Sequence, residues 1–177
     1  MDRIPFQVTP AGDKYRFRKL PVHVLLADIR SLYNVGAFFR TCDAAGIDTL
    51  HLCGITGYPP DHQIHKTALD AEESVRWRRS PDALELVREL RDAGHEIAAV
   101  ETSLHAVDLY EWRPRFPVCL VFGNEVDGLD PALSGACDTH VRIPMLGVKH
   151  SLNVATAGGV AIYELLRKYR EATTAGL

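Results

Sequence analysis

Residues 118–129 read VCLVFGNEVDGL, an apolar run of strand length that stops abruptly at glycine and polar residues. A continuous apolar run is typical of a central strand in a parallel sheet, where both faces are buried. In open α/β sheets the carboxyl ends of the strands face the ligand crevice. We therefore expect Gly123, Asn124 and Glu125 to lie where a small molecule binds.

A second transition from strand to loop lies nearer the C-terminus. Residues 141–153 read VRIPMLGVKHSLN, a short apolar strand that leaves through a proline- and glycine-containing loop. Ser151 is placed to cap a helix from Leu152 to about Tyr169. We expect this loop and the loop at 123–129 to meet over one pocket.

The predicted C-terminal helix is apolar on almost every side before Glu164, which is typical of a buried helix. Gly158 and Gly159 lie in its middle, where each costs roughly 1 kcal/mol relative to alanine. We infer that the fold needs these missing side chains so that another backbone can approach closely. A ligand, another segment or a second subunit could be the group that approaches.

The rest of the chain alternates apolar strands with helices. Strands are expected at 22–27, 48–53, 75–78 and 96–100, helices at about 35–45 and 81–93, a helix or loop at 62–73, and a loop at 107–117. This order predicts an α/β protein with a mainly parallel sheet and helices on both faces. No GxGxxG follows the first strand and no GxxxxGK[ST] occurs, so the dinucleotide and P-loop interpretations lose their usual support.

Composition suggests one domain in the cytoplasm. The chain has 177 residues and is 46% hydrophobic, with no run near the ~20 apolar residues of a membrane span and no signal-peptide core. The four cysteines are widely spaced without a C-x-x-C, which indicates reduced core thiols and no metal site or disulfide.

The charge distribution is uneven. The net charge of −3 argues against a protein that coats nucleic acid, whereas residues 1–20 carry a local charge of +3. Arg76, Arg78 and Arg79 flank Trp77 in a second basic cluster, which is more often ordinary solvated surface. We expect His62, His65 and His150 to be surface residues because none has a carboxylate at diagnostic spacing.

Three motifs together identify a family. They are N-x-G-A-x-x-R-T at 34–41, F-G-N-E-x-x-G-L at 122–129 and I-P-M-x-G-x-x-x-S-L-N-V at 143–154. In this order they resemble the SpoU/TrmH family of RNA ribose 2′-O-methyltransferases, over residues 22 to 170. The resemblance implies a SPOUT-class fold whose C-terminal segment forms a deep trefoil knot that binds S-adenosylmethionine. General topology rules make a knot improbable, so the sequence pattern alone does not predict one.

The resemblance also implies roles for particular residues. It implies a methyltransferase domain at 21–177 after a short basic extension at 1–20, a homodimer that joins through the C-terminal helix, and a tRNA or rRNA site shared between subunits. Residues matching the donor-binding positions are Thr102, Gly123, Ile143 and Leu152. Residues matching the catalytic pocket are Arg40, Asn34, Glu125, Ser151 and Asn153.

The chain departs from the family at Leu69-Asp70-Ala71-Glu72, where many relatives have a glycine before the alanine, so we assign no RNA contact there. Two other functions stay open at this point. One is a non-catalytic RNA-binding homologue with the same fold, which the intact motif residues argue against. The other is a small-molecule α/β enzyme using the same crevice, which the missing phosphate-binding motifs argue against.

Overall fold

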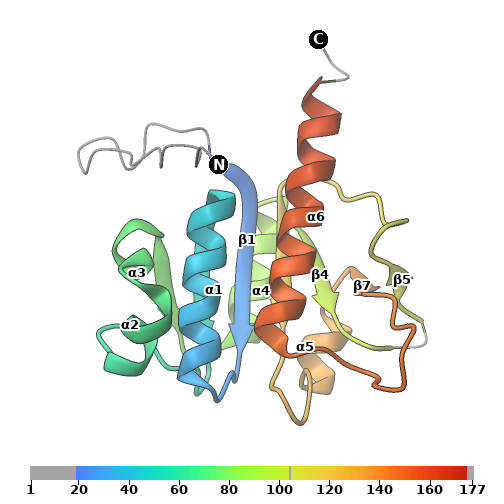
Figure 1. The fold of residues 1–177 in the computed structure, drawn as a ribbon. Coiled ribbons are helices and arrows are strands. Elements are labelled where there is room, and N and C mark those ends of the chain that lie inside the picture. The colour runs from blue at the N-terminus through green and yellow to red at the C-terminus, as the bar shows by residue number, and fades with distance from the viewer. Residues whose placement is uncertain (1–18, 104, 175–177) are drawn as a thin grey trace, which may run out of the picture.

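The structure is a computed structural model that describes residues 19–103 and 105–174. Within these residues one sheet of seven strands has the order β3-β2-β1-β6-β4-β7-β5, and its ladders are all parallel (Figure 1). The strands are β1 (Leu20–Ala27), β2 (Ile47–Cys53), β3 (Trp77–Ser80), β4 (Glu96–Val100), β5 (Val107–Asp108), β6 (Val118–Phe122) and β7 (Thr139–Arg142). The predicted α/β class with a mainly parallel sheet is confirmed.

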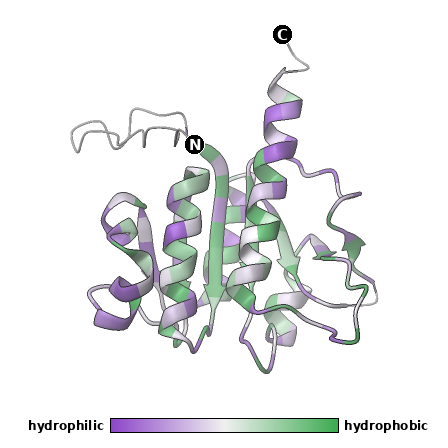
Figure 2. Cartoon of the chain, in the orientation of Figure 1, coloured by the Kyte–Doolittle hydropathy of each residue, from purple (hydrophilic) through white to green (hydrophobic). Residues whose placement is uncertain are grey.

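Helices cover both faces of the sheet. On one face α1 (Leu32–Ala45) and α6 (Val154–Thr174) pack side by side, with α2 (His62–Ala68) and α3 (Ala71–Ser74) against α1 (Figure 1). On the other face α4 (Ala83–Asp92) and α5 (Pro131–Gly135) pack over a second group of buried side chains. Hydrophobic residues run along β1 through the middle, whereas the helices also carry hydrophilic residues (Figure 2).

The close approach predicted at the C-terminal helix is made by α1. A Cβ on Gly158 would lie 2.2 Å from Cε1 of Phe38, a fully buried ring that also packs on Phe122 with centroids 5.0 Å apart. Gly159 has no such neighbour, because nothing described lies within 4 Å of its added Cβ. The segment that needs Gly158 is therefore the first helix of the same chain.

The C-terminal helix differs from its prediction in two ways. It begins at Val154, and its first amides are capped by Asn153 where Ser151 was expected, since Asn153 Oδ1 accepts from the amides of Ala155 and Thr156 at 3.0 and 3.2 Å. It is also not buried all round: Ala161, Ile162 and Leu165 are buried against the sheet, but Tyr163 is 49% exposed. The face of α6 that carries Thr156 and Tyr163 is thus open in the single chain.

Local pattern also missed some short elements. The predicted loop at 107–117 contains the short strand β5, α5 was not predicted, and the uncertain region at 62–73 forms two short helices. Cys42, Cys53 and Cys119 are buried as predicted, and Cys137 is half-buried. No described helix is long and apolar enough to cross a membrane. The predicted basic extension lies outside the described residues except for its last two positions.

Candidate active site

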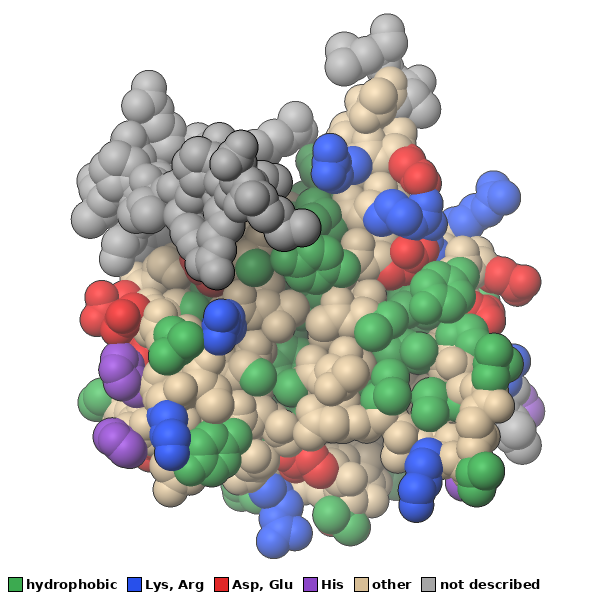
Figure 3. Space-filling view, in the orientation of Figure 1, with side chains coloured by type: hydrophobic (Ala, Val, Ile, Leu, Met, Phe, Trp, Pro, Cys, Tyr) green, Lys and Arg blue, Asp and Glu red, His purple; other side chains and the backbone are tan. Residues whose placement is uncertain are grey.

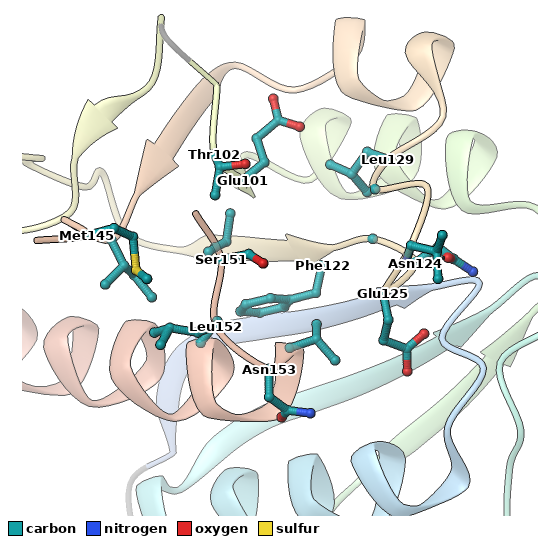
Figure 4. Close-up of a pocket in the computed structure, with 17 residues that line it drawn as sticks. Glu101, Thr102, Phe122, Asn124, Glu125, Leu129, Met145, Ser151, Leu152 and Asn153 are labelled. Carbon is teal, nitrogen blue, oxygen red and sulfur yellow. Dashed lines mark hydrogen bonds between the residues drawn. The ribbon is translucent and has the colours of Figure 1, made fainter. Parts of the chain in front are cut away.

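A pocket of about 350 Å³ opens at the carboxyl ends of β4, β6 and β7, beside the start of α6. Parallel strands place their following loops at one edge of the sheet, so three segments far apart in sequence converge there. In Figure 4 Phe122 lies in the middle of the pocket, with Thr102 on one side and Glu125 and Asn153 on the other. The two glycine-containing loops do meet over one pocket, as predicted.

The loop after β6 is held by its own backbone. The amide of Asn124 donates to the carbonyl of Gly128 and the amide of Gly128 donates back, each at 3.0 Å. Gly128 has a positive φ of 72°, which favours glycine. A Cβ on Gly123 would lie 2.5 Å from the carbonyl carbon of Gly128, so only glycine fits where the loop folds over itself.

Asn124 ties this loop to its surroundings. Its Nδ2 donates to the carbonyl of Asp28 at 2.8 Å, and its Oδ1 accepts from the amides of Val126 and Asp127 at 2.8 and 3.1 Å. The side chain thereby fixes the loop after β6 to the end of β1. These three hydrogen bonds explain why an asparagine follows Gly123 at the end of β6.

Glu125 joins the loop after β6 to the start of α1. Its Oε2 accepts from the amide of Arg30 at 3.0 Å, and its Oε1 accepts from the amide of Ser31 at 3.1 Å and from Nδ2 of Asn34 at 2.9 Å. Desolvation opposes ionisation of this carboxyl, but the hydrogen bonds outweigh it and lower the pKa of Glu125 below its ordinary value. Glu125 is therefore an ionised anchor at neutral pH.

Asn153 completes a polar chain across the pocket rim. Its Nδ2 donates to Oδ1 of Asn34 at 3.1 Å while its Oδ1 caps α6. Asn34 in turn donates to Glu125, so one amide connects two loops that are both far from it in sequence. We call Asn34, Glu125 and Asn153 the rim chain. It fixes the relative positions of three segments and presents their polar side chains at the pocket opening.

The loop after β7 is built differently. Residues 144–152 make no hydrogen bond to any other described residue, and Leu146 and Val148 are 100% and 91% exposed. In Figure 3 hydrophobic side chains gather over the loops to the right of α6. This wall of the pocket is therefore open to solvent.

The structure brings most of the predicted residues together. The predicted donor-binding residues all line the pocket, as do three of the predicted catalytic ones: Thr102, Gly123, Ile143, Leu152, Glu125, Ser151 and Asn153. Asn34 contacts Glu125 and Asn153 at the rim. The first helix is capped by Ser31, whose Oγ accepts from the amide of Asn34 at 3.3 Å.

Arg40 stands apart from this pocket. It lies exposed on the middle of α1, in a shallow hollow with Lys66, Thr67 and Tyr163. Asn34 is in the first turn of the same helix, so the motif residues at 34 and 40 face different places. Within one chain Arg40 does not line the pocket that holds Glu125.

Sequence reasoning assigned no site role to several lining residues. Phe122, Leu129 and Met145 form the apolar part of the lining, and Glu101 adds a second carboxylate. The signal for Met145 and Leu129 was present, because both belong to the motifs already quoted. Glu101 directly follows β4, and its side chain points away from the middle of the pocket in Figure 4.

Comparison with known proteins identifies the family of this chain. The model of the SpoU rRNA Methylase family matches residues 21–163. The chain belongs to that family. It is 32% identical over 153 residues to a tRNA (guanosine(18)-2′-O)-methyltransferase of Thermus thermophilus, and this match covers 86% of this chain and 78% of the relative. It is 34% identical over 149 residues to a 23S rRNA (guanosine-2′-O-)-methyltransferase of Haemophilus ducreyi, and this match covers 84% of this chain and 60% of the relative.

Solved structures of SpoU proteins have the same fold. A TrmH/SpoU tRNA modifying enzyme of A. aeolicus superposes with a TM-score of 0.80 at 28% identity, over 88% of this chain and 79% of that one. An AdoMet-bound rRNA methyltransferase of Sinorhizobium meliloti superposes with a TM-score of 0.77 at 28% identity. The superposition covers 86% of this chain and 61% of that one. The chain spans only 58% of a TrmH family relative from Staphylococcus epidermidis, so some family members are considerably longer.

Proposed function

We propose that this SpoU family member transfers a methyl group from S-adenosylmethionine to a ribose 2′-hydroxyl of tRNA or rRNA. The observation that carries the proposal is the rim chain, which joins residues from all three family motifs at the opening of one pocket. Relatives named as tRNA and rRNA 2′-O-methyltransferases support the substrate class. An AdoMet-bound family structure supports the donor.

The pocket suits the methyl donor in size and charge. Its volume of about 350 Å³ lies within the usual range for small-molecule sites. The lining includes Glu125 and, directed away from the middle of the pocket, Glu101, but no described lysine or arginine, which suits a ligand with a positive sulfonium and ammonium. Phe122, Leu129 and Met145 offer an apolar surface for the adenine ring. We propose that Thr102, Gly123, Ile143 and Leu152 hold the donor, largely through backbone groups.

The bound donor supplies an electrophilic methyl carbon. The ribose 2′ oxygen must approach that carbon in line, so that the new C–O bond forms as the C–S bond breaks and its electron pair goes to sulfur. Asn34, Ser151 and Asn153 provide directional hydrogen bonds at the opening where the ribose would enter, and positioning of this kind supplies much of the acceleration. Glu125 keeps Asn34 oriented and is not free to act as a base, because its oxygens already accept three hydrogen bonds.

We propose that Arg40 anchors the target phosphate and stabilises the developing alkoxide, while a phosphate oxygen or a water takes the proton. A guanidinium is a poor base because its pKa is above ~12. Since Arg40 lies outside the pocket of its own chain, this role requires a second copy. The open face of α6 is the proposed dimer interface, and Tyr163 on that helix shares a hollow with Arg40. A homodimer through α6 would thus carry Arg40 to the partner's pocket.

The finer features of the family fold belong to the same proposal. We propose that the loops at 123–129 and 144–152 belong to a deep trefoil knot within a methyltransferase domain at 21–177, that the basic segment at 1–20 is an extension to it, and that the protein acts in the cytoplasm on tRNA or rRNA. The match of residues 21–163 to the SpoU family model supports these proposals.

The decisive experiment incubates the full chain with methyl-labelled S-adenosylmethionine and either tRNA or rRNA, then digests the RNA to nucleosides. Label on the ribose of one nucleotide is the expected result. Donor binding by calorimetry without methyl transfer to either RNA would favour the non-catalytic RNA-binding homologue. Methylation on a base would refute the ribose assignment.

Arg40→Ala tests the catalytic assignment. Turnover should fall by roughly 100-fold or more, by analogy with deletion of an oxyanion donor, while donor binding stays nearly intact. Arg40→Lys should fail almost as badly because an ammonium lacks the planar grip of a guanidinium. Lys149→Ala is the contrast, expected mainly to weaken RNA affinity. A mixture of Arg40→Ala and Glu125→Gln chains should regain partial activity only if Arg40 acts across a dimer.

A further inference from the structure

Two exposed tyrosines near the rim chain each lie beneath a cation. Tyr33 is 46% exposed, with Nζ of Lys66 5.9 Å from the centre of its ring. Tyr58 is 41% exposed, with the guanidinium carbon of Arg79 4.5 Å from its ring centre and Nη1 donating to its hydroxyl at 3.3 Å. We call Tyr33, Lys66, Tyr58 and Arg79 the cation–aromatic track.

The track starts beside the pocket and ends at the edge of the sheet. Tyr33 precedes Asn34 of the rim chain, and Tyr58 and Arg79 lie at the carboxyl ends of β2 and β3. The two halves adjoin, because a Cβ on Gly57 would lie 2.1 Å from Cδ2 of Leu32, the residue before Tyr33. β3 is the strand at the edge of the sheet, three strands away from β6, so the track leads from the side of the pocket towards that edge.

The cations of the track differ in their pairing from their neighbours. Arg76 is 3.7 Å from Asp48 and Arg78 is 3.2 Å from Glu89, whereas no described carboxylate lies within ion-pair distance of Arg79 or Lys66. The carboxylate of Asp61, which caps α2, is occupied by backbone amides. In Figure 3 Lys and Arg side chains border hydrophobic ones over α1 and α2. An external anion is therefore the natural partner for Lys66 and Arg79.

We propose that the track binds a single-stranded RNA segment that flanks the methylated nucleotide. Bases would stack against the two cation–aromatic pairs, and phosphates would contact Lys66 and Arg79, as in other proteins that hold single strands with aromatic platforms and basic grooves. The inference rests on the proposed function, because it places the strand next to the rim chain. Stacking accepts any base, so the track holds the strand without reading its sequence. Trp77, whose ring centroid is 6.4 Å from that of Tyr58, lies next to this outer pair.

The test measures binding, so that it does not depend on methyl transfer. An unstructured, labelled oligoribonucleotide of about 12 nucleotides is titrated with the full chain, and fluorescence anisotropy is followed at several salt concentrations. Tyr58→Leu and Tyr33→Leu should each weaken binding roughly 10-fold without changing its salt dependence, whereas the matched Tyr→Phe changes keep the ring and should bind normally. Arg79→Ala should weaken binding and lower the log–log salt slope by about 0.7.

Controls separate the track from general surface effects. Tyr110→Leu removes another exposed tyrosine, and Arg78→Ala removes the arginine paired with Glu89; both should change affinity less than twofold. The track is overturned if the leucine variants bind like wild type, if Arg78→Ala weakens binding as much as Arg79→Ala, or if the variants impair self-association by light scattering and not RNA binding. Methyl transfer to RNA by the wild-type chain in those cases would leave the proposed function standing. If the wild-type chain transfers no methyl group but its RNA binding depends on the track residues, the proposed enzyme activity is refuted and the proposal for the track stands.

Discussion

The two loops that enclose the pocket differ in how they are held. The loop after β6 closes on itself through paired backbone hydrogen bonds, is fastened to β1 by Asn124 and to α1 by Glu125, and folds over Gly123 without space for a side chain. The loop after β7 has no hydrogen bond to a described residue over 144–152 and exposes Leu146 and Val148 almost fully. One wall of the pocket is formed by the chain itself, and the other needs a ligand or a second subunit to cover its apolar side chains.

This difference has a physical consequence for binding. A wall already fixed in the free chain loses little conformational freedom when a ligand arrives, whereas a loop that becomes ordered on binding loses more and lowers the observed affinity. The loop after β6 should thus set the geometry of the pocket. The loop after β7 should set how tightly and how long the donor is held.

The largest expected effect comes from a matched pair of glycine substitutions. Gly123→Ala should destabilise the protein by about 3 kcal/mol, since the added Cβ meets backbone on Gly128 and Leu129 that has no free direction in which to move. Turnover should fall by roughly 100-fold as the pocket wall shifts. Gly147→Ala should change neither, because its Cβ meets nothing described within 4 Å. Chemical denaturation and methyl-transfer assays measure both. Equal sensitivity of the two positions would remove the contrast between the loops.

A smaller effect is expected from Glu125 and pH. Because the folded-state pKa of Glu125 is lowered, its stabilising contribution is present above the ordinary value of 4.5 and is lost as pH falls through the lower folded value. The wild-type chain should therefore lose stability more steeply than Glu125→Gln as pH is lowered below about 4.5. Denaturation midpoints at a series of pH values would measure this. Parallel curves for the two proteins would show that the carboxylate does not anchor the loop.

The smallest expected effect belongs to the exposed side chains of the other loop. Leu146→Ser and Val148→Ser should each alter the free energy of unfolding by less than about 0.5 kcal/mol, as is usual for surface positions. They should nevertheless weaken donor binding or dimer formation if this loop becomes covered in the working enzyme. Denaturation, calorimetry with S-adenosylmethionine and light scattering distinguish these outcomes. A large loss of stability would mean that the loop is already packed in the free chain.

Local sequence pattern predicted those parts of the fold that depend on neighbouring residues. The strands at 22–27 and 118–122 were visible because burial on both faces requires continuous apolar runs, and the end of α1 at Gly46 followed from a left-handed cap with φ of 69°. The cap of α6 was misplaced by two residues, since Ser151 and Asn153 are equally good caps by type. Only the backbone path of the loop decides which one reaches the free amides.

What the sequence by itself determined is the fold class, the two glycine loops and the identity of the residues that could bind or react. It could not determine which of these residues meet, because Asn34 lies 91 positions from Glu125 and 119 from Asn153. Such contacts depend on the strand order and on which loops share the carboxyl edge of the sheet. The same is true of the half-buried His23 and the buried His51, hydrogen-bonded at 2.9 Å from neighbouring strands. It is true also of Arg40, which shares a motif with Asn34 but, on a helix with 3.6 residues per turn, faces away from the pocket.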